Sequence, residues 1–317
     1  MKKSFLACYF FLILLLNSCA QSNTENKLCN FFSYGDYTPP VLLQVYMKDE
    51  KTAVFVFDED VVPLENSFSV SCELSQSGNK VFAVLRHFLK PGNEQVISGS
   101  VSDKSGNTTR IKVNLCGYNS HPAVLLINEF TTKGTEKQPD RTELAVLADG
   151  STAGMVLYDG VPSDYRQSVK LPDLNVKKGD YIVIRWNESS VNTVSQDNVY
   201  DINAGGTGLS DNNGILVLAL TSLLSSEVCD CVVYSSMSSN QYDGFGTKAV
   251  YQRVQTALEN SWWKGDAVLS SNSTSTRSMN RKTEETDTDG NDDWYVCITG
   301  GSSFGSRNSS EQFQPSK

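Results

Sequence analysis

Apolar residues fall in short runs along the first third of the chain. The runs cover residues 41–47, 52–57, 68–74, 81–88, 95–101 and 110–115, at a spacing of roughly ten residues. Within them, Phe68, Val70, Cys72 and Leu74 alternate with polar residues, and residues 111–115 repeat this pattern. Strict alternation is typical of a strand that buries one face. The pattern predicts an all-β sandwich over residues 39–117.

A turn motif lies before the last of these runs. Residues 99–109 contain Asp103, Gly106 and Asn107, which supply the positive φ and the side-chain hydrogen bonds that a tight turn needs. The motif resembles the D-x-x-G-N-T hairpin that closes many bacterial immunoglobulin-like domains. The resemblance implies an immunoglobulin-like first domain, and residues 118–122 are predicted to be a short linker.

A second β-rich block begins at residue 123. The apolar run 124–130 ends in Asn128-Glu129-Phe130, and after a polar loop residues 142–147 form another run, so the two are predicted to pair as antiparallel strands. Further candidate strands cover residues 181–186, 215–220, 228–234 and 294–298, with residues 267–269 as a weaker candidate. Residues 187–213 are predicted to be a long polar loop, and the spacing of Val250, Val254, Ala257 and Leu258 predicts a helix over 247–260.

Three motifs of this block resemble the bacterial lamin-tail family. They are the I-N-E-F strand ending at Phe130, an S-x-x-R segment at Ser278–Arg281, and the D-T-D segment from Asp287 that is followed by an aromatic residue at Trp294. The resemblance spans Leu126 to Gly300 and implies a second immunoglobulin-like sandwich, used for binding, over residues 123–300. One departure is Thr142 before Glu143, where family members often carry an aromatic residue. Residues 301–317, rich in Ser and Gly, are predicted to be a disordered tail.

The N-terminus has the form of an export signal. Basic residues at 2–3 precede a twelve-residue apolar run, Phe5–Leu16, which is shorter than the ~20 residues of a membrane span. The sequence Leu16-Asn17-Ser18-Cys19 resembles the bacterial lipoprotein box, of the kind found in spirochaetes. It implies cleavage after residue 18, lipid attachment (palmitate) at Cys19, residues 19–38 as a tether, and a place in the cell envelope at the outer membrane or facing the periplasm. The alternative is an ordinary cleaved signal with a chance Cys.

Charge narrows the choice of partner. Removing residues 1–18 removes two of the 27 basic residues and none of the 36 acidic ones, which leaves 25 basic residues and a formal charge of −11. Nucleic-acid binding depends on Lys and Arg that neutralise phosphates. We therefore expect the membrane, through the lipid anchor, and a protein or glycan as partners, and no nucleic acid.

Three features of the sequence are candidates for a metal, phosphate or catalytic site. The acidic run 287–293 lacks the spacing and flanking helices of a calcium loop, and a solvated turn is predicted. The glycine-rich run 205–208 is not followed by Lys-Ser/Thr, so a flexible loop is predicted. His87 and His121 have no Ser, Cys or carboxylate pattern around them. No catalytic residue, cofactor or metal site is predicted.

Six cysteines remain after signal cleavage and lipidation. Cys229 and Cys231 lie two apart on a predicted strand, point to one face and do not bond to each other readily. A disulfide from Cys297 to one of them is predicted, because the last strand of a sandwich usually pairs near an internal strand. A metal site built on Cys229 and Cys231 needs a second Cys or His pair at metal-ligand spacing, and the sequence has none. Buried free thiols are the alternative to the disulfide.

Aromatic residues next to Gly flank the predicted helix. Tyr242, Phe245, Trp262 and Trp263 are candidate binding residues, with core packing as the alternative. Together these features predict a non-enzymatic binding or structural module of the envelope. The rival prediction is an exported hydrolase, particularly a nuclease, because lamin-tail-like domains occur attached to such enzymes. The residues outside the two sandwiches leave no room for a catalytic domain.

Overall fold

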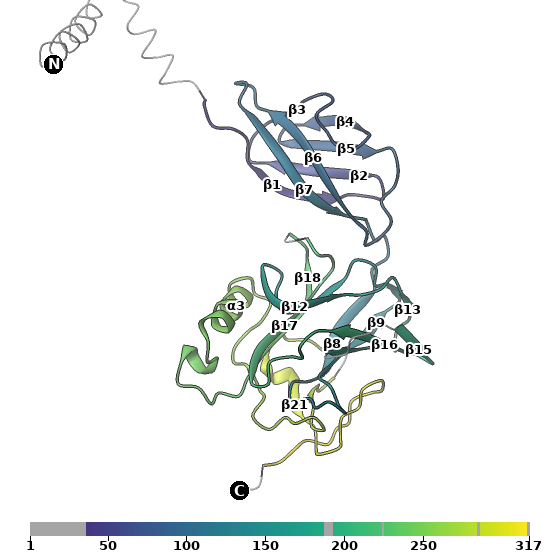
Figure 1. The fold of residues 1–317 in the computed structure, drawn as a ribbon, viewed down its shortest axis with the longest axis vertical. Helices are drawn as coiled ribbons and strands as arrows, with labels where there is room; N and C mark the ends of the chain where they lie inside the picture. Colours follow the sequence, from purple (N-terminus) through teal and green to yellow (C-terminus); the bar gives the residue numbers. More distant parts are fainter. Residues whose placement is uncertain (1–35, 187–192, 224, 284–285, 316–317) are drawn as a thin grey trace, which may run out of the picture.

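A computed structural model of the chain describes residues 36–186, 193–223, 225–283 and 286–315. The predicted signal, the lipid-attachment residue Cys19, Cys29 and most of the predicted tether lie outside these ranges. The chain is predominantly β, as predicted, and forms two domains stacked along the long axis (Figure 1). Among the described residues, no helix is long and apolar enough to span a membrane.

The first domain consists of two sheets that share one core. One has the order β1 (Leu42–Met47), β2 (Thr52–Phe57), β5 (Lys80–Leu85) and β4 (Cys72–Ser77), and the other has the order β3 (Val62–Pro63), β6 (Glu94–Ser102) and β7 (Thr108–Cys116). Phe55 and Val81 of the first sheet pack with Ile97 and Leu115 of the second. The apolar runs therefore predicted the strands well, except that the run at 68–74 forms a strand only from Cys72 and that β3 was missed.

The turn between β6 and β7 has the predicted chemistry. Asp103 Oδ1 accepts a hydrogen bond from the backbone N–H of Asn107 at 2.8 Å, and Gly106 has φ 90°. An Asp side chain that bonds to the backbone and a glycine in the left-handed region together stabilise a tight turn. The hairpin runs in full register from Ser102↔Thr108 to Glu94↔Cys116.

The second domain also has two main sheets. The larger has the order β15 (Thr193–Gln196), β16 (Val199–Gly205), β14 (Tyr181–Trp186), β9 (Arg141–Ala148), β8 (Val124–Thr131), β20 (Met279–Arg281) and β21 (Trp294–Val296). The smaller has the order β12 (Asp164–Lys170), β11 (Val156–Val161), β17 (Asn213–Ala219), β18 (Val228–Ser235) and β19 (Val268–Leu269). A two-stranded ladder joins β10 (Gly150–Ser151) to β13 (Asn175–Val176). β8 and β9 pair antiparallel, as predicted.

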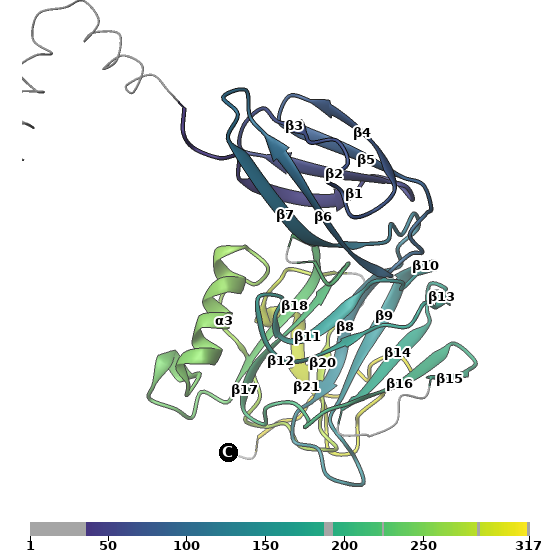
Figure 2. The ribbon, with the colours of Figure 1, turned by 45° about the horizontal axis from the view of Figure 1, so that its top comes forward.

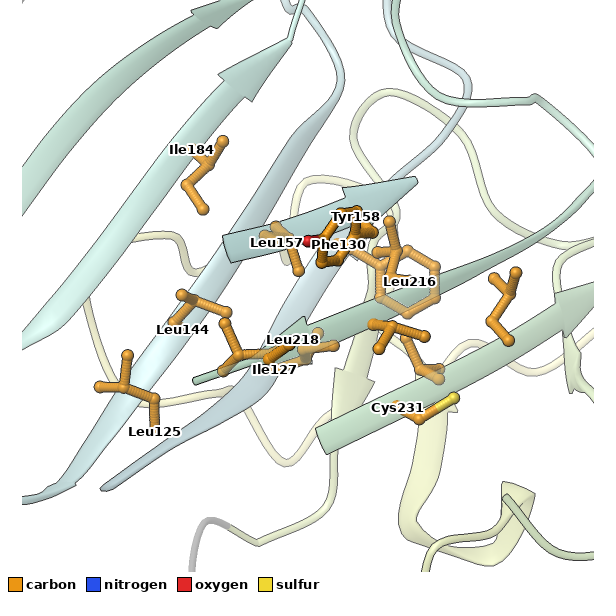
Figure 3. Close-up of a cluster of buried hydrophobic side chains, with 14 of the residues drawn as sticks. Leu125, Ile127, Phe130, Leu144, Leu157, Tyr158, Ile184, Leu216, Leu218 and Cys231 are labelled. Atoms are coloured by element: carbon orange, nitrogen blue, oxygen red, sulfur yellow. The ribbon is translucent and has the colours of Figure 1, made fainter. Parts of the chain in front are cut away.

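Apolar side chains from both sheets fill the space between them (Figure 3). Leu125, Ile127 and Leu144 come from the larger sheet, and Leu157 and Leu218 come from the smaller. Each fully buried side chain of this size contributes roughly 1.5–3 kcal/mol relative to an exposed one. This core fixes the distance between the sheets and so positions the loops at their edges.

One region departs from the prediction of a long loop over residues 187–213. β15 and β16 form an antiparallel hairpin within it, and β16 runs parallel to β14. β15 is the edge strand of the larger sheet, and β16 lies between β15 and β14. A polar run of this kind has no periodicity from which strands are recognised.

The predicted helix is present as α3 (Lys248–Glu259). Thr247 caps it, because its side-chain oxygen accepts a hydrogen bond from the N–H of Val250 at 3.3 Å. Val254 and Ala257 on its inner face are buried. The helix covers one flank of the smaller sheet (Figure 2), and it contacts β11 and β17.

The two domains touch beyond the linker. Glu94 of the first domain forms an ion pair with Lys170 at 3.0 Å and accepts a hydrogen bond from Ser222 at 2.8 Å. Gly92 lies so close to Gly154 that a Cβ at position 92 would come within 2.4 Å of the Gly154 nitrogen. Asn119, in the predicted linker, donates to the carbonyl of Ser151 at 2.9 Å. The linker is therefore part of a packed joint.

Candidate functional site

Two of the three motifs that carry the lamin-tail resemblance meet with Glu143 in one buried polar cluster. Asn128 and Glu129 belong to the I-N-E-F motif, Glu143 lies on the second strand, and Ser278 and Asn280 belong to the S-x-x-R segment; all five are completely buried. Asn128 Nδ2 donates to Glu143 at 2.9 Å, and the Ser278 hydroxyl donates to Glu129. Buried polar groups need such partners. The motif residues are therefore linked to one another within the domain.

The C-terminal segment covers this cluster, and the prediction of a disordered tail over residues 301–317 is wrong for its described part. The N–H of Ser303 donates to both Glu129 oxygens, at 2.9 and 3.1 Å, and the N–H of Gly305 donates to Glu143. Asn308 donates to Asn128 Oδ1 at 3.0 Å. Burial raises the pKa of Glu129, and the hydrogen bonds from Ser278 and Ser303 oppose that rise. We call residues 301–313 the C-terminal strap.

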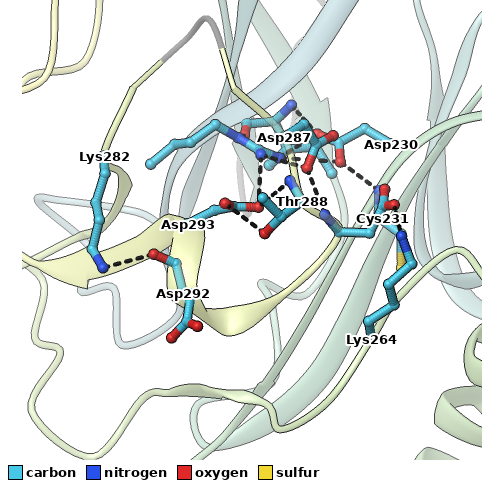
Figure 4. Close-up of polar contacts among 11 residues, drawn as sticks. Asp230, Cys231, Lys264, Lys282, Asp287, Thr288, Asp292 and Asp293 are labelled. Carbon is cyan, nitrogen blue, oxygen red and sulfur yellow. Dashed lines mark hydrogen bonds and ion pairs between the residues drawn. The ribbon is translucent and has the colours of Figure 1, made fainter.

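Arg281 lies at the centre of a second buried network. It is 1% exposed, and it contacts Asp230 at 2.9 Å, Asp287 at 2.9 Å and Asp293 at 3.7 Å. Figure 4 shows these carboxylates together with Thr288, which donates to Asp293 through its N–H and its hydroxyl at 2.8 Å. Burial lowers the pKa of Arg281, but the carboxylates raise it above its ordinary value. The acidic run 287–293 is thus largely an ion-pair network, and the predicted solvated turn is wrong for Asp293, which is buried.

A large open cavity lies elsewhere in the second domain, between β11, β12, the segment before β17 and the first turns of α3. We call it the α3 cleft. Its volume is about 720 Å³, and its polar lining includes Asp159, Arg166, Thr207, Asp211, Asn213 and Arg253. A cavity of this size with a few convergent polar groups is the usual form of a ligand site.

A β-bulge shapes one wall of the α3 cleft. The register of β11 and β12 shifts between Asp159 and Gly160, which pair with Gln167 and Tyr165, so that Arg166 is the extra residue. Gly160 has φ 139°, and a Cβ there would lie 2.4 Å from the Tyr165 Cα. Bulges re-aim side chains next to functional sites. Here Arg166 reaches Asp159, with Nη1 and Oδ2 at 3.2 Å.

Among the titratable groups of the α3 cleft, Asp159 has the most clearly shifted pKa. It is buried, and burial raises its pKa to about 6, although Arg166 and the hydrogen bond from Gln167 at 3.3 Å lower it. Such a shift in a cleft is a sign of function, although structural ion pairs cause shifts as well. Asp159 therefore loses its proton closer to neutral pH than an ordinary aspartate does.

An arginine on α3 fixes the opposite wall. Arg253 donates to both oxygens of Asp164, from Nε at 2.9 Å and from Nη2 at 3.0 Å. A bidentate pair restricts geometry more than a single bond does. The hydrogen bonds from Arg253 hold the pKa of Asp164 below its usual value. The pair ties α3 to β12 across the cleft.

The floor of the α3 cleft is held by bonds from outside it. The N–H of Leu209 donates to Asp140 at 2.8 Å, the Thr132 hydroxyl donates to the Asp211 carbonyl at 2.8 Å, and the Ser270 hydroxyl donates to the Asn212 carbonyl at 2.6 Å. Gln167 holds Thr207 and Gly208, with Nε2 donating to the Gly208 carbonyl at 2.7 Å. The glycine-rich run was predicted to be a flexible loop, but Gln167 fixes this end of it. A site supported in this way is preorganised.

The four candidate binding aromatics differ in how deeply they are buried. Trp263 is 2% exposed, with its indole N–H donating to the Asp266 carbonyl at 3.1 Å, and Phe245 is also buried. Trp262 is half-buried against the core, whereas Tyr242 is 43% exposed. Trp263 is thus a core residue and not a surface anchor. Among the described residues of this domain, α3 is the only helix of more than three residues, and Trp263 belongs to the core with Trp262 packed against it.

The predicted disulfide is not formed. Cys229, Cys231 and Cys297 are all free, as are the other described cysteines, Cys72 and Cys116. Cys231 lies on β18 of the smaller sheet, whereas Cys297 follows β21 at the edge of the larger, where its Sγ is 3.3 Å from the Ser278 hydroxyl. The expectation failed because the last strand joins the other sheet. Burial raises the pKa of Cys229 to about 12.

Sequence reasoning did not find Asp159, Arg166 or Arg253. Arg253 lies on the predicted helix, but no strand was predicted over β11 or β12, which carry Asp159 and Arg166, and the three residues meet only through the fold. The one available signal was Asp159-Gly160 in the middle of an apolar run, because a charged residue and a glycine are unfavourable inside a strand.

The TP_1001_2nd family, described as a protein second domain, matches residues 123–296. No curated protein shows a significant match. Among solved structures, dimeric latent PorU from Porphyromonas gingivalis aligns with 13% sequence identity and a TM-score of 0.16, covering 65% of this chain and 19% of that one.

Proposed function

The chain belongs to the TP_1001_2nd family through residues 123–296, and because that family has no established function, we propose a function from the geometry of this domain. The protein is a lipid-anchored, non-enzymatic binding module of the bacterial cell envelope. Its α3 cleft binds a neutral, hydroxyl-rich ligand such as a glycan. The first domain acts as the spacer between the anchor and the binding domain.

The balance of charge in the α3 cleft carries this proposal. The lining contains two acidic residues, Asp159 and Asp211, and two basic ones, Arg166 and Arg253. The cleft is formally neutral on a chain whose overall charge is −9. Donors and acceptors in nearly equal number suit hydroxyl groups, which both donate and accept. A strongly anionic ligand finds no uncompensated positive charge there.

The anchor and the domain types rest on sequence. The Leu16–Cys19 box supports lipid attachment at Cys19, and several acyl chains give stable membrane binding without a spanning helix. The resemblance of the two domains to an immunoglobulin-like domain and to the lamin-tail family supports a binding role over a catalytic one. The motif residues of that second resemblance are the ones that form the buried cluster around Glu129 and Glu143.

Calorimetric titration of the soluble chain, from residue 20 onward, against matched neutral and sulfated oligosaccharides tests the proposal. We expect a neutral oligosaccharide to bind. Asp159→Asn and Arg166→Gln should each weaken it about 10-fold or more, because a hydrogen bond to a charged group contributes roughly 1.5–3 kcal/mol. Lys104→Gln, which breaks an exposed ion pair in the first domain, is the matched control. Unchanged affinity in both cleft variants would place the ligand elsewhere.

The rival candidate is an exported hydrolase, and one observation favours it. A carboxyl group with a pKa of about 6 in a cleft, as at Asp159, suits general acid–base catalysis near neutral pH. The same titrations, followed by mass analysis of each oligosaccharide after prolonged incubation, separate the two functions. Cleavage that is lost in Asp159→Asn would establish the hydrolase.

A further inference from the structure

A second cavity lies on the other side of α3, between the helix and strands β18 and β19. Its volume is about 440 Å³. The helix contributes Tyr251, Val254 and Leu258, and the sheet side contributes Val233 and Leu269. We call it the β19 groove. It does not share lining residues with the α3 cleft.

Large apolar side chains stand exposed at the rim of the β19 groove. Met237 is 57% exposed and Leu269 is 47% exposed, and both line the groove. Tyr242, 43% exposed, lies beside them, with its ring 6.1 Å from that of Tyr251. Exposed apolar residues that gather around a groove, unlike scattered ones, mark interaction sites.

The backbone holds this rim in an unfavourable conformation. Met237, Tyr242 and Asp243 have φ of 55°, 51° and 52°. Positive φ is costly for residues other than glycine and persists where the surrounding structure imposes it. Gly244 makes room for the arrangement, because a Cβ there would lie 2.6 Å from the Met237 sulfur. The exposed positions of Met237 and Tyr242 are thus fixed by the fold.

The charge of the β19 groove is one-sided. Asp243 and Asp266 line it, and no Lys or Arg does. Both residues are exposed, and neither carboxylate has a hydrogen-bond or ion-pair partner within residues 36–315 as far as the structure describes them. The nearby Lys264 is already paired with Asp289 at 2.8 Å. Two unpaired carboxylates beside an apolar groove favour a cationic ligand group.

The groove also lies along a sheet edge. β19 is the last strand of the smaller sheet and pairs parallel with β18 through only two residue pairs. An edge strand offers backbone groups to an added extended segment, and neighbouring pockets then select its side chains. The groove offers apolar side chains and two carboxylates. An extended peptide presents both apolar and basic groups when these two kinds of side chain alternate along it.

We infer that the β19 groove binds an extended peptide segment in which apolar residues alternate with Lys or Arg. The apolar side chains lie against Tyr251, Leu258 and Leu269, and the basic ones pair with Asp243 and Asp266. This site is separate from the glycan site proposed for the α3 cleft, so each stands or fails by its own measurements.

Fluorescence anisotropy with the soluble chain tests the inference. The probe is a labelled octapeptide that alternates Leu and Lys, and its counterpart alternates Leu and Glu. We expect the Leu-Lys peptide to bind and the Leu-Glu peptide to bind at least 10-fold more weakly. The double variant Asp243→Asn/Asp266→Asn should weaken the Leu-Lys peptide about 3- to 10-fold, as expected for two exposed ion pairs.

A matched control separates the groove from the acidic surface in general. Glu65→Gln/Glu73→Gln removes the same charge from exposed positions of the first domain and should leave binding unchanged. Leu269→Ser should weaken binding without altering the circular dichroism spectrum. An equal loss in the Glu65/Glu73 variant, or equal binding of both peptides, overturns the inference. Binding of a fluorescent fatty acid in place of the Leu-Lys peptide would assign the groove to an acyl chain and overturn it as well.

Discussion

Arg281 donates two hydrogen bonds from one nitrogen to Asp230, at 2.9 and 3.1 Å, although both side chains are 1% exposed. The pair joins β20 of the larger sheet to β18 of the smaller one, and Asp230 also accepts from the N–H of Ile127 at 2.6 Å. Two charges without water are stable only when nearly all their hydrogen-bonding groups are satisfied. The contact therefore fixes how one edge of the sandwich closes.

Breaking this pair should be costly. Arg281→Met leaves the buried Asp230 carboxylate without its cationic partner, and we expect the free energy of unfolding to fall by about 3–5 kcal/mol. Urea denaturation followed by circular dichroism measures it. The control is Lys104→Gln, whose exposed ion pair with Asp60 should contribute less than about 1 kcal/mol. Similar losses in the two cases would show that the buried pair is not special.

The pH dependence of stability should report on Asp159. Its pKa is about 6 in the folded protein and ordinarily 3.8, so the folded state holds a proton that the unfolded state has lost. Stability due to this group is present below about pH 4 and is lost as pH rises through about 6, by roughly 3 kcal/mol. The difference in unfolding free energy between the wild type and Asp159→Asn should follow this curve.

Asp164 gives the comparison of opposite sign. Hydrogen bonds from Arg253 lower its pKa, so its contribution is present above the ordinary pKa of an aspartate and is lost as pH falls below it. The wild type should therefore lose its advantage over Asp164→Asn on acidification. A common slope for both variants would contradict the assignment of these shifts.

The aromatic residues near α3 should divide into core and surface. Trp263→Ala removes a buried side chain, and we expect a loss of about 3–5 kcal/mol in unfolding free energy. Tyr242→Ala changes an exposed side chain and should alter stability by less than about 1 kcal/mol. Thermal and urea unfolding decide between them. A Trp263→Ala protein of normal stability would contradict the assignment of Trp263 to the core and favour a role for it in binding.

The C-terminal strap should contribute strongly to stability. Truncation after Gly301 removes the N–H groups that bond to Glu129 and Glu143, and each lost bond to a buried carboxylate costs roughly 1.5–3 kcal/mol. We expect a loss of at least about 3 kcal/mol by urea denaturation. Truncation after Gln314, which keeps every strap contact, is the control. A strap that can be removed without loss would contradict its structural role.

Lipid attachment is tested directly at Cys19. Cells expressing Cys19→Ser should accumulate an uncleaved precursor that takes up no palmitate analogue, because the modified thiol is absent. The wild-type chain, labelled in parallel, should incorporate the analogue and migrate as the shorter form. Labelling of the Cys19→Ser chain would overturn the lipoprotein assignment.

Local patterns predicted local structure well. Alternation predicted the strand around Ile111, an apolar run predicted the strand around Leu144, and helical spacing predicted α3 to within one residue at each end. These elements succeed because their apolar faces are visible in a window of about ten residues. The hairpin of β15 and β16 was not predicted, since its polar run has no period to detect.

Long-range relationships were beyond the reach of the sequence. The strap looked disordered because its Ser and Gly residues carry no apolar pattern, yet their N–H groups are what Glu129 and Glu143 need. Asp159 and Arg253 are 94 positions apart, and nothing local to either one indicates the shared cleft. Motif resemblance located Asn128, Glu129 and Arg281, but it did not say that they would be buried.

The joint between the domains has a mechanical consequence. Glu94 at the start of β6 bonds to both Lys170 and Ser222, and Gly92 just before β6 lies against Gly154, so the contact joins one end of β6 to several segments of the second domain. A pulling force applied to the second domain is transmitted to β6 through these contacts, in addition to the tension in residues 118–122. Bending at the joint requires these contacts to break, so they oppose a change in the angle between the two domains.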